Sequence, residues 1–122
     1  MIKKKILVID DDPLVLKTFR GLLVRDGYEV LLASSYAEAL EVFSKGEFDL
    51  VLSDIRMPGK NGVETTQEIQ SRLLNAGKKD LPIIFITGYA EDGIKLNAGF
   101  IGEVLAKPVD NNRLLMTIRD YL

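Results

Sequence analysis

Short apolar runs alternate with segments of helical periodicity along the chain, and this alternation restricts the possible folds more than any other feature. The runs are rich in Val, Ile and Leu and apolar on both faces, as strands of a covered parallel sheet should be. They read KILVID (5–10), EVLLAS (29–34), DLVLSD (49–54), PIIFITG (82–88) and EVLAK (103–107). Because a crossover between parallel strands needs a helix, the pattern predicts an α/β fold with helices on both faces of an open sheet.

The five predicted helices differ in how clearly the sequence marks them. The first, second and last place apolar residues three and four positions apart. In the first helix these residues are Val15, Phe19, Leu22 and Leu23, and Gly27 follows it. In the second they are Tyr36, Ala39, Leu40 and Phe43, followed by Gly46. In the last they are Leu114, Ile118 and Leu122. The third helix, about 62–76, is polar early and apolar only at Ile69 and Leu73. The fourth, about 91–98, is short and flanked by glycines, so it is the least clearly marked.

Composition excludes several kinds of chemistry. At 122 residues, with 47% apolar and 28% charged residues, the chain has the size and balance of one globular domain. It contains no Cys and no His, which excludes disulfides, thiol nucleophiles, Cys/His zinc sites and a histidine base. The net charge of -2 and the lack of a bilayer-length apolar run argue against nucleic-acid binding and membrane insertion. We therefore expect a cytoplasmic protein.

Four of the five predicted strands end in a polar residue that can do chemistry. The first ends at Asp10, Asp11 and Asp12, the third at Asp54, the fourth at Thr87 and the fifth at Lys107. Open parallel sheets bind their ligands at the carboxyl ends of the strands. The sequence therefore predicts a site at this edge of the sheet.

The motifs ILVIDDDP, DLVLSDIRMPGKNGVE, PIIFITG and LAKP stand in the order and spacing of the receiver domain of two-component response regulators. The chain resembles that family over nearly its whole length. The resemblance implies a flavodoxin-like, doubly wound sheet of five parallel strands in the order 2-1-3-4-5 with five helices. It also implies that residues 1–122 are a single receiver domain with no output domain, either a stand-alone regulator or part of a larger protein.

By this resemblance Asp54 is the phosphoacceptor. Its carboxylate would take a phosphoryl group from a phosphohistidine of a sensor histidine kinase or a phosphotransfer protein, forming an acyl phosphate. A conformational change would relay the signal to an output domain or target protein. Such a domain catalyses its own phosphorylation and dephosphorylation without being a conventional turnover enzyme. The competing interpretation of Asp54 alone is a turn residue before RMPG.

The resemblance also assigns a metal site. Asp11 would bind the metal directly, Asp10 would assist partly through water, and Asp54 and the backbone carbonyl of Arg56 would complete the protein ligands. Oxygen ligands without Cys or His suit Mg²⁺ or Mn²⁺. Asp12 has a simpler explanation, because an Asp before Pro13 is an ordinary helix start.

Lys107 and Thr87 are the remaining site residues that the resemblance implies. Lys107 would hold a phosphoryl oxygen as a compact charge, and Thr87 would bond the phosphoryl group once it has formed. Their simpler interpretations are a solvated lysine in a turn and a β-branched residue at a strand end. The resemblance further implies a cis peptide at Lys107-Pro108. Val104 departs from the family, which usually carries Tyr or Phe there, so the coupling between the threonine and an aromatic ring is in question.

Two other functions remain open at the level of sequence. One is a receiver-like interaction module that works without phosphorylation, which the Val104 departure favours. The other is a phosphatase of the haloacid dehalogenase type, whose nucleophile would be the first-strand Asp10 rather than Asp54. That enzyme class needs a longer chain with a cap. The position of the acid-labile phosphoryl group would separate all three functions.

Overall fold

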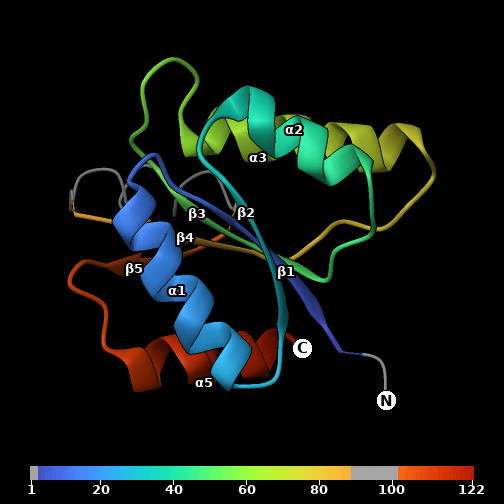
Figure 1. The fold of residues 1–122 in the computed structure, drawn as a ribbon. Coiled ribbons are helices and arrows are strands. Elements are labelled where there is room, and N and C mark those ends of the chain that lie inside the picture. Colours follow the sequence, from blue (N-terminus) through green and yellow to red (C-terminus); the bar gives the residue numbers. More distant parts are fainter. Residues whose placement is uncertain (1–2, 89–101) are drawn as a thin grey trace.

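The computed structural model describes residues 3–88 and 102–122, in which five parallel strands form one sheet (Figure 1). The strands are β1 (Lys5–Ile9), β2 (Glu29–Ala33), β3 (Leu50–Asp54), β4 (Ile83–Thr87) and β5 (Glu103–Ala106). Their order is β2-β1-β3-β4-β5, which confirms the predicted order. The two strands that carry the predicted acids, β1 and β3, are therefore neighbours, and Ile9 lies opposite Ser53.

The described helices lie on both faces of the sheet (Figure 1). They are α1 (Pro13–Arg25), α2 (Tyr36–Ser44), α3 (Gly62–Asn75) and α5 (Asn111–Tyr121). Helices α1 and α5 cover one face, and α2 and α3 cover the other. The fourth predicted helix, about 91–98, falls outside the described residues. Among the helices of residues 3–88 and 102–122, none is long and apolar enough to cross a membrane.

Two apolar cores fill the space between the sheet and its helices, because successive strand residues point to opposite faces. The core beneath α2 and α3 includes Leu7, Ile9, Val51, Phe85, Ile69 and Leu73. The core beneath α1 and α5 includes Val8, Leu52, Ile84, Ile86, Leu23 and Ile118. Each fully buried Leu or Ile stabilises the fold by about 1.5–3 kcal/mol relative to an exposed one. These cores hold the strand ends in fixed positions.

Side-chain caps set where three of the helices begin. Asp12 caps α1 by accepting a hydrogen bond from the Leu14 amide at 2.9 Å, with Pro13 as the first helical residue. The helix-start interpretation of Asp12 is thus confirmed. Ser35 caps α2, and Asn61 caps α3 in a reciprocal pair with Glu64. Capping of this kind satisfies amide groups that have no partner within the helix.

Candidate functional site

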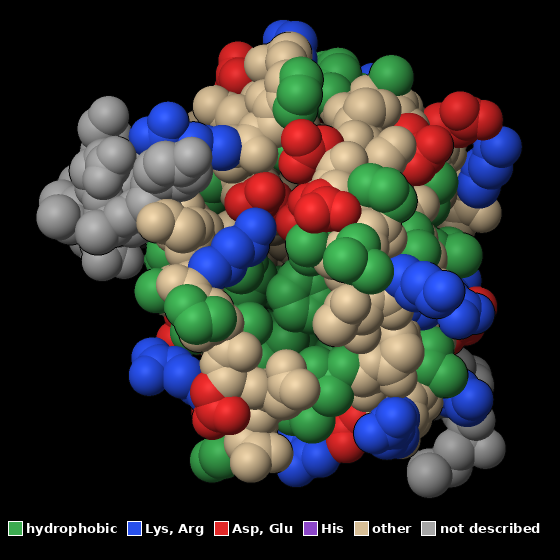
Figure 2. Space-filling view, turned by 60° about the vertical axis from the view of Figure 1, so that its left-hand side comes forward, with side chains coloured by type: hydrophobic (Ala, Val, Ile, Leu, Met, Phe, Trp, Pro, Cys, Tyr) green, Lys and Arg blue, Asp and Glu red, His purple; other side chains and the backbone are tan. Residues whose placement is uncertain are grey.

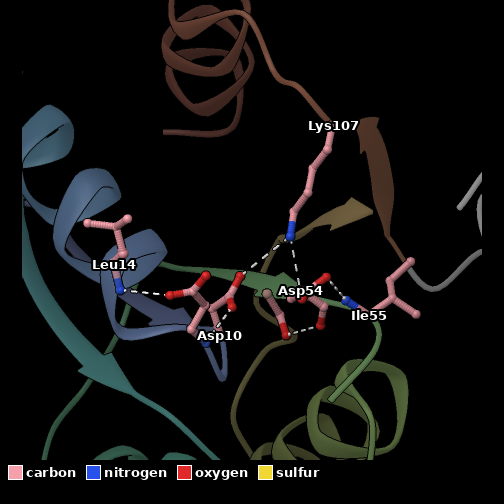
Figure 3. A network of polar contacts seen from close by, with 7 residues as sticks. Asp10, Leu14, Asp54, Ile55 and Lys107 are labelled. Carbon is pink, nitrogen blue, oxygen red and sulfur yellow. Dashed lines mark hydrogen bonds and ion pairs between the residues drawn. The ribbon is translucent and has the colours of Figure 1, made fainter. Parts of the chain in front are cut away.

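The carboxyl ends of β1, β3 and β5 bring two carboxylates and an ammonium group together (Figure 3). The Lys107 Nζ atom lies 3.5 Å from Oδ2 of Asp54 and 3.8 Å from Oδ2 of Asp10. Figure 2 shows acidic side chains gathered in the middle of this face beside a basic one, above a hollow with hydrophobic side chains at its base. Residues far apart in sequence therefore form one charged cluster.

Asp10 is the most deeply buried acid of the cluster. It is 2% exposed, and its Oδ1 atom accepts a hydrogen bond from the Asp12 amide at 2.9 Å. Its Oδ2 atom is buried and has no hydrogen-bond partner, since Lys107 at 3.8 Å is too distant to donate. Burial raises the pKa of Asp10 to about 6, the Asp12 amide opposes the shift, and the charge of Asp54 adds to it.

The two carboxylate oxygens of Asp54 have different neighbours. Oδ1 accepts a hydrogen bond from the Ile55 amide at 2.8 Å, and Oδ2 faces Lys107 (Figure 3). Burial raises the pKa of Asp54, while Lys107 and the Ile55 amide act in the opposite direction. One oxygen of this carboxylate is thus anchored to the backbone, and the other points into the cluster.

The acids also form a set that fits a hard cation. One carboxylate oxygen from each of Asp10, Asp11 and Asp54 lies within 4.8 Å of the others, and Asp11 is exposed. The buried Oδ2 atom of Asp10 has no hydrogen-bond partner, and the nearest positive charge, on Lys107, is 3.8 Å away, so a bound cation would lower the cost of burying it. The all-oxygen donor set is the one that Mg²⁺ and Mn²⁺ prefer. These residues therefore fit the predicted metal.

Thr87 and Arg56 lie at or just after the carboxyl ends of β4 and β3, which are adjacent strands. Thr87 ends β4 and is 3% exposed, and its carbonyl accepts a hydrogen bond from the Lys107 amide at 2.7 Å, so the two residues are adjacent. Arg56 follows Asp54 by two residues in the connection to α3.

The peptide bond between Lys107 and Pro108 is cis, which confirms that prediction. Val104, at the departure from the family pattern, is half-buried against the core beneath α2 and α3.

Two residues that support Asp54 could not be identified from the sequence pattern. Ser53 is 1% exposed within β3, and its hydroxyl donates to the Asp54 carbonyl at 2.8 Å. Gly62 begins α3 so close to β3 that a Cβ atom there would overlap the Asp54 carbonyl. A polar residue inside an apolar strand was the only available signal for Ser53. Gly62 was predicted only as the start of a helix.

The chain belongs to the response regulator receiver domain family, whose model matches residues 6–119. Domains of this family act in two-component signalling. Among its curated relatives, the polar-differentiation response regulator DivK of Brucella ovis is 30% identical over 98% of this chain and 96% of its own length. The transcriptional regulatory protein GlrR of Escherichia coli is 34% identical over 96% of this chain, which spans only 26% of GlrR.

Solved structures agree with this assignment. Response regulator TrrA of Thermotoga maritima, described in complex with Mg²⁺ and BeF, has a TM-score of 0.85 and 34% identity over 98% of this chain and 99% of its own. Chemotaxis protein CheY4 of Vibrio cholerae has a TM-score of 0.84 and 28% identity over 99% of this chain and all of its own. The five-stranded order found here is thus that of receiver domains.

Proposed function

We propose that this receiver domain accepts a phosphoryl group on Asp54 from a phosphohistidine of a sensor kinase or phosphotransfer protein. The observation that carries the proposal is the convergence of Asp54, Asp10 and Lys107 from three different strands, within 3.8 Å of the lysine nitrogen. A structural role alone does not require Lys107 to lie beside the buried Asp10 and the half-buried Asp54, because an ion pair with an exposed lysine adds little stability.

In the proposed reaction, Oδ2 of Asp54 attacks the phosphorus atom. The bond between phosphorus and the histidine nitrogen of the donor breaks, its electron pair stays on the imidazole, and the imidazole takes up a proton from water. The product is an acyl phosphate on Asp54. Lys107, already 3.5 Å from Oδ2, neutralises charge on the incoming phosphoryl oxygens. The hydroxyl of Thr87, whose backbone carbonyl accepts from the Lys107 amide, would bond the phosphoryl group once it has formed.

The metal site belongs to the same proposal. Asp10, Asp11, Asp54 and the backbone carbonyl of Arg56 would hold Mg²⁺, which when bound supplies positive charge to the phosphoryl oxygens. The buried Oδ2 of Asp10, which has no hydrogen-bond partner, and the three-carboxylate cluster support this assignment. The Mg²⁺ and BeF named for the TrrA structure support it from a relative. Signal output would follow from a conformational change at the same edge of the sheet.

The test is incubation with acetyl phosphate and Mg²⁺ followed by intact-protein and peptide mass spectrometry. We expect one phosphoryl group, carried by the peptide that contains Asp54, and no labelling in Asp54→Asn or in EDTA. Asp120→Asn, which removes an exposed carboxylate from α5, is the matched control and should label normally. Labelling of Asp10 would indicate the phosphatase alternative, and no labelling under any condition would indicate the interaction module.

A further inference from the structure

The peptide group between Asp54 and Ile55 is held at both of its polar atoms. Its carbonyl oxygen accepts a hydrogen bond from the Ser53 hydroxyl at 2.8 Å. Its N–H donates to Oδ1 of Asp54, also at 2.8 Å. Because a peptide group is planar, fixing the direction of the carbonyl also fixes the direction of the N–H. The Ser53 hydroxyl therefore helps to determine where Oδ1 lies.

Orientation of Oδ1 determines the position of the reactive oxygen. The two oxygens of a carboxylate are rigidly connected, so an anchor on Oδ1 leaves Oδ2 pointing towards Lys107 at 3.5 Å. A nucleophile gains most of its rate advantage from being held in a productive position, and a small displacement is costly. Ser53 does not touch the phosphoryl group, because its side chain lies on the α3 face of the sheet with Val51.

The first residue of helix α3, Gly62, packs closely against the Asp54–Ile55 peptide group. The Gly62 amide donates to the Ile55 carbonyl at 2.7 Å, directly beyond the peptide group that Ser53 holds. A Cβ atom at Gly62 would overlap the Asp54 carbonyl and come within 2.9 Å of the Ser53 hydroxyl oxygen. The bond between Ser53 and Asp54 is therefore packed tightly under the helix, where water cannot easily replace it.

We propose that Ser53 is a positioning residue for the phosphoacceptor: its buried hydroxyl orients the Asp54–Ile55 peptide group, whose N–H in turn orients the Asp54 carboxylate. The inference rests on the proposed function of Asp54. The alternative is that Ser53 only satisfies its own hydrogen bond within a packed strand. In that case its removal would lower stability without a specific effect on the carboxylate or on phosphorylation.

The first experiment observes the contact without phosphorylation. The backbone amide protons of Ser53→Ala and wild type are compared by NMR in the presence of Mg²⁺. We expect the Ile55 amide proton to move upfield by more than those of Val51 and Leu52, because its bond to the carboxylate weakens. Ser53→Thr, which keeps the hydroxyl, should restore the wild-type shift. An Ile55 amide that is unchanged in Ser53→Ala would overturn the inference.

The second experiment measures phosphorylation kinetics with acetyl phosphate at saturating Mg²⁺. Ser53→Ala should lower the maximal rate about tenfold while changing the half-saturating acetyl phosphate concentration less than about twofold. Ser53→Thr should recover most of the rate. Thr65→Val is the matched control, because it removes another buried hydroxyl that bonds a backbone carbonyl, that of Asn61, at 2.8 Å. It should leave both parameters unchanged.

The outcomes separate this inference from the proposed function. A wild-type rate in Ser53→Ala, or an equal loss in Thr65→Val, would overturn the positioning role. If Asp54→Asn still accepts the phosphoryl group, the proposed function fails, and the Ile55 amide shift still decides whether Ser53 orients the carboxylate. A shifted amide with a lowered maximal rate that Ser53→Thr rescues supports the inference.

Discussion

At the scale of single residues, Lys107 acts as the counter-ion of the metal-free cluster. Its ammonium group lies between Asp10 and Asp54, where it offsets part of the repulsion between a buried and a half-buried carboxylate. The same position brings it into competition with a divalent cation for those oxygens. If the proposed function holds, we therefore expect Lys107 to have opposite effects on metal binding and on phosphoryl transfer.

This competition predicts the behaviour of Lys107→Ala. Phosphorylation by acetyl phosphate should slow by a factor of about 10² or more, because a charge aimed at the phosphoryl oxygens is lost. Mg²⁺ affinity should stay the same or increase, because the competing ammonium group is gone. Isothermal titration calorimetry and phosphorylation kinetics measure the two effects. Lys60→Ala is the control, because the Lys60 ammonium group lies over the Tyr36 ring, 5.2 Å from its centroid. A weaker Mg²⁺ affinity in Lys107→Ala would contradict the counter-ion role.

At the scale of elements, the start of α1 depends on Asp12 through a local contact. Asp12→Ala removes the cap on the Leu14 amide and should lower the free energy of unfolding by about 1 kcal/mol. Asp12→Ser keeps a capping oxygen and should be close to wild type. Thermal unfolding in EDTA compares the two variants without the metal. Equal stability of Asp12→Ala and Asp12→Ser would show that the cap contributes little.

The start of α3 depends instead on a close approach between elements. Gly62→Ala should destabilise the protein by at least about 2 kcal/mol, since the new methyl group would overlap the Asp54 carbonyl and α3 would have to move. Gly21→Ala is the matched control. Gly21 lies inside α1, and a methyl group added there would meet no atom within 4 Å, so alanine should stabilise by about 0.4–1 kcal/mol. The midpoint of urea unfolding should thus move to lower urea in Gly62→Ala and to higher urea in Gly21→Ala.

Sequence patterns predicted the elements better than they predicted the contacts between them. The position of Asp10, Asp54, Thr87 and Lys107 at one edge of the sheet could be predicted, because parallel strands have their carboxyl ends at the same edge. Ser53 and Gly62 were not assigned a role, because their importance comes from how closely α3 approaches β3. That distance is set by tertiary packing and leaves no periodic signal in the sequence.

At the scale of the whole molecule, the acid cluster links stability to pH. The pKa of Asp10 is raised to about 6 in the folded protein from an ordinary value of 3.8. A raised folded pKa means that the native state binds the proton more tightly than the unfolded chain. The stabilisation of the folded protein by this tighter proton binding at Asp10 is therefore fully present below about pH 4 and is lost as the pH rises through about 6. For Asp10 alone it amounts to at most about 3 kcal/mol.

In EDTA we therefore expect wild type to unfold at a higher temperature near pH 5 than at pH 7.5. Asp10→Asn should lose most of this dependence and should exceed wild type in stability at pH 7.5. Mg²⁺ at ten times its dissociation constant should add about 1.4 kcal/mol to wild type and less to the variant. Calorimetry at both pH values, with and without Mg²⁺, measures these differences. Wild-type stability in EDTA that is flat or rising between pH 5 and 7.5 would contradict the prediction.

Strand β2 lies at the edge of the sheet, and its carboxyl end supplies none of the clustered side chains. Local opening of β2 therefore differs from an opening that separates the strands carrying the cluster. The cluster is complete only when β1, β3 and the segment after β5 are in place together, so metal binding selects against any opening that separates them. Fraying that begins at Glu29, the amino end of β2, leaves those residues in place, whereas opening at Ala33 would release the Asp10 amide, which donates to the Ala33 carbonyl at 3.1 Å. Hydrogen exchange in β2 that proceeds by such fraying should therefore be unaffected by Mg²⁺, whereas exchange in β1 and β3 should slow.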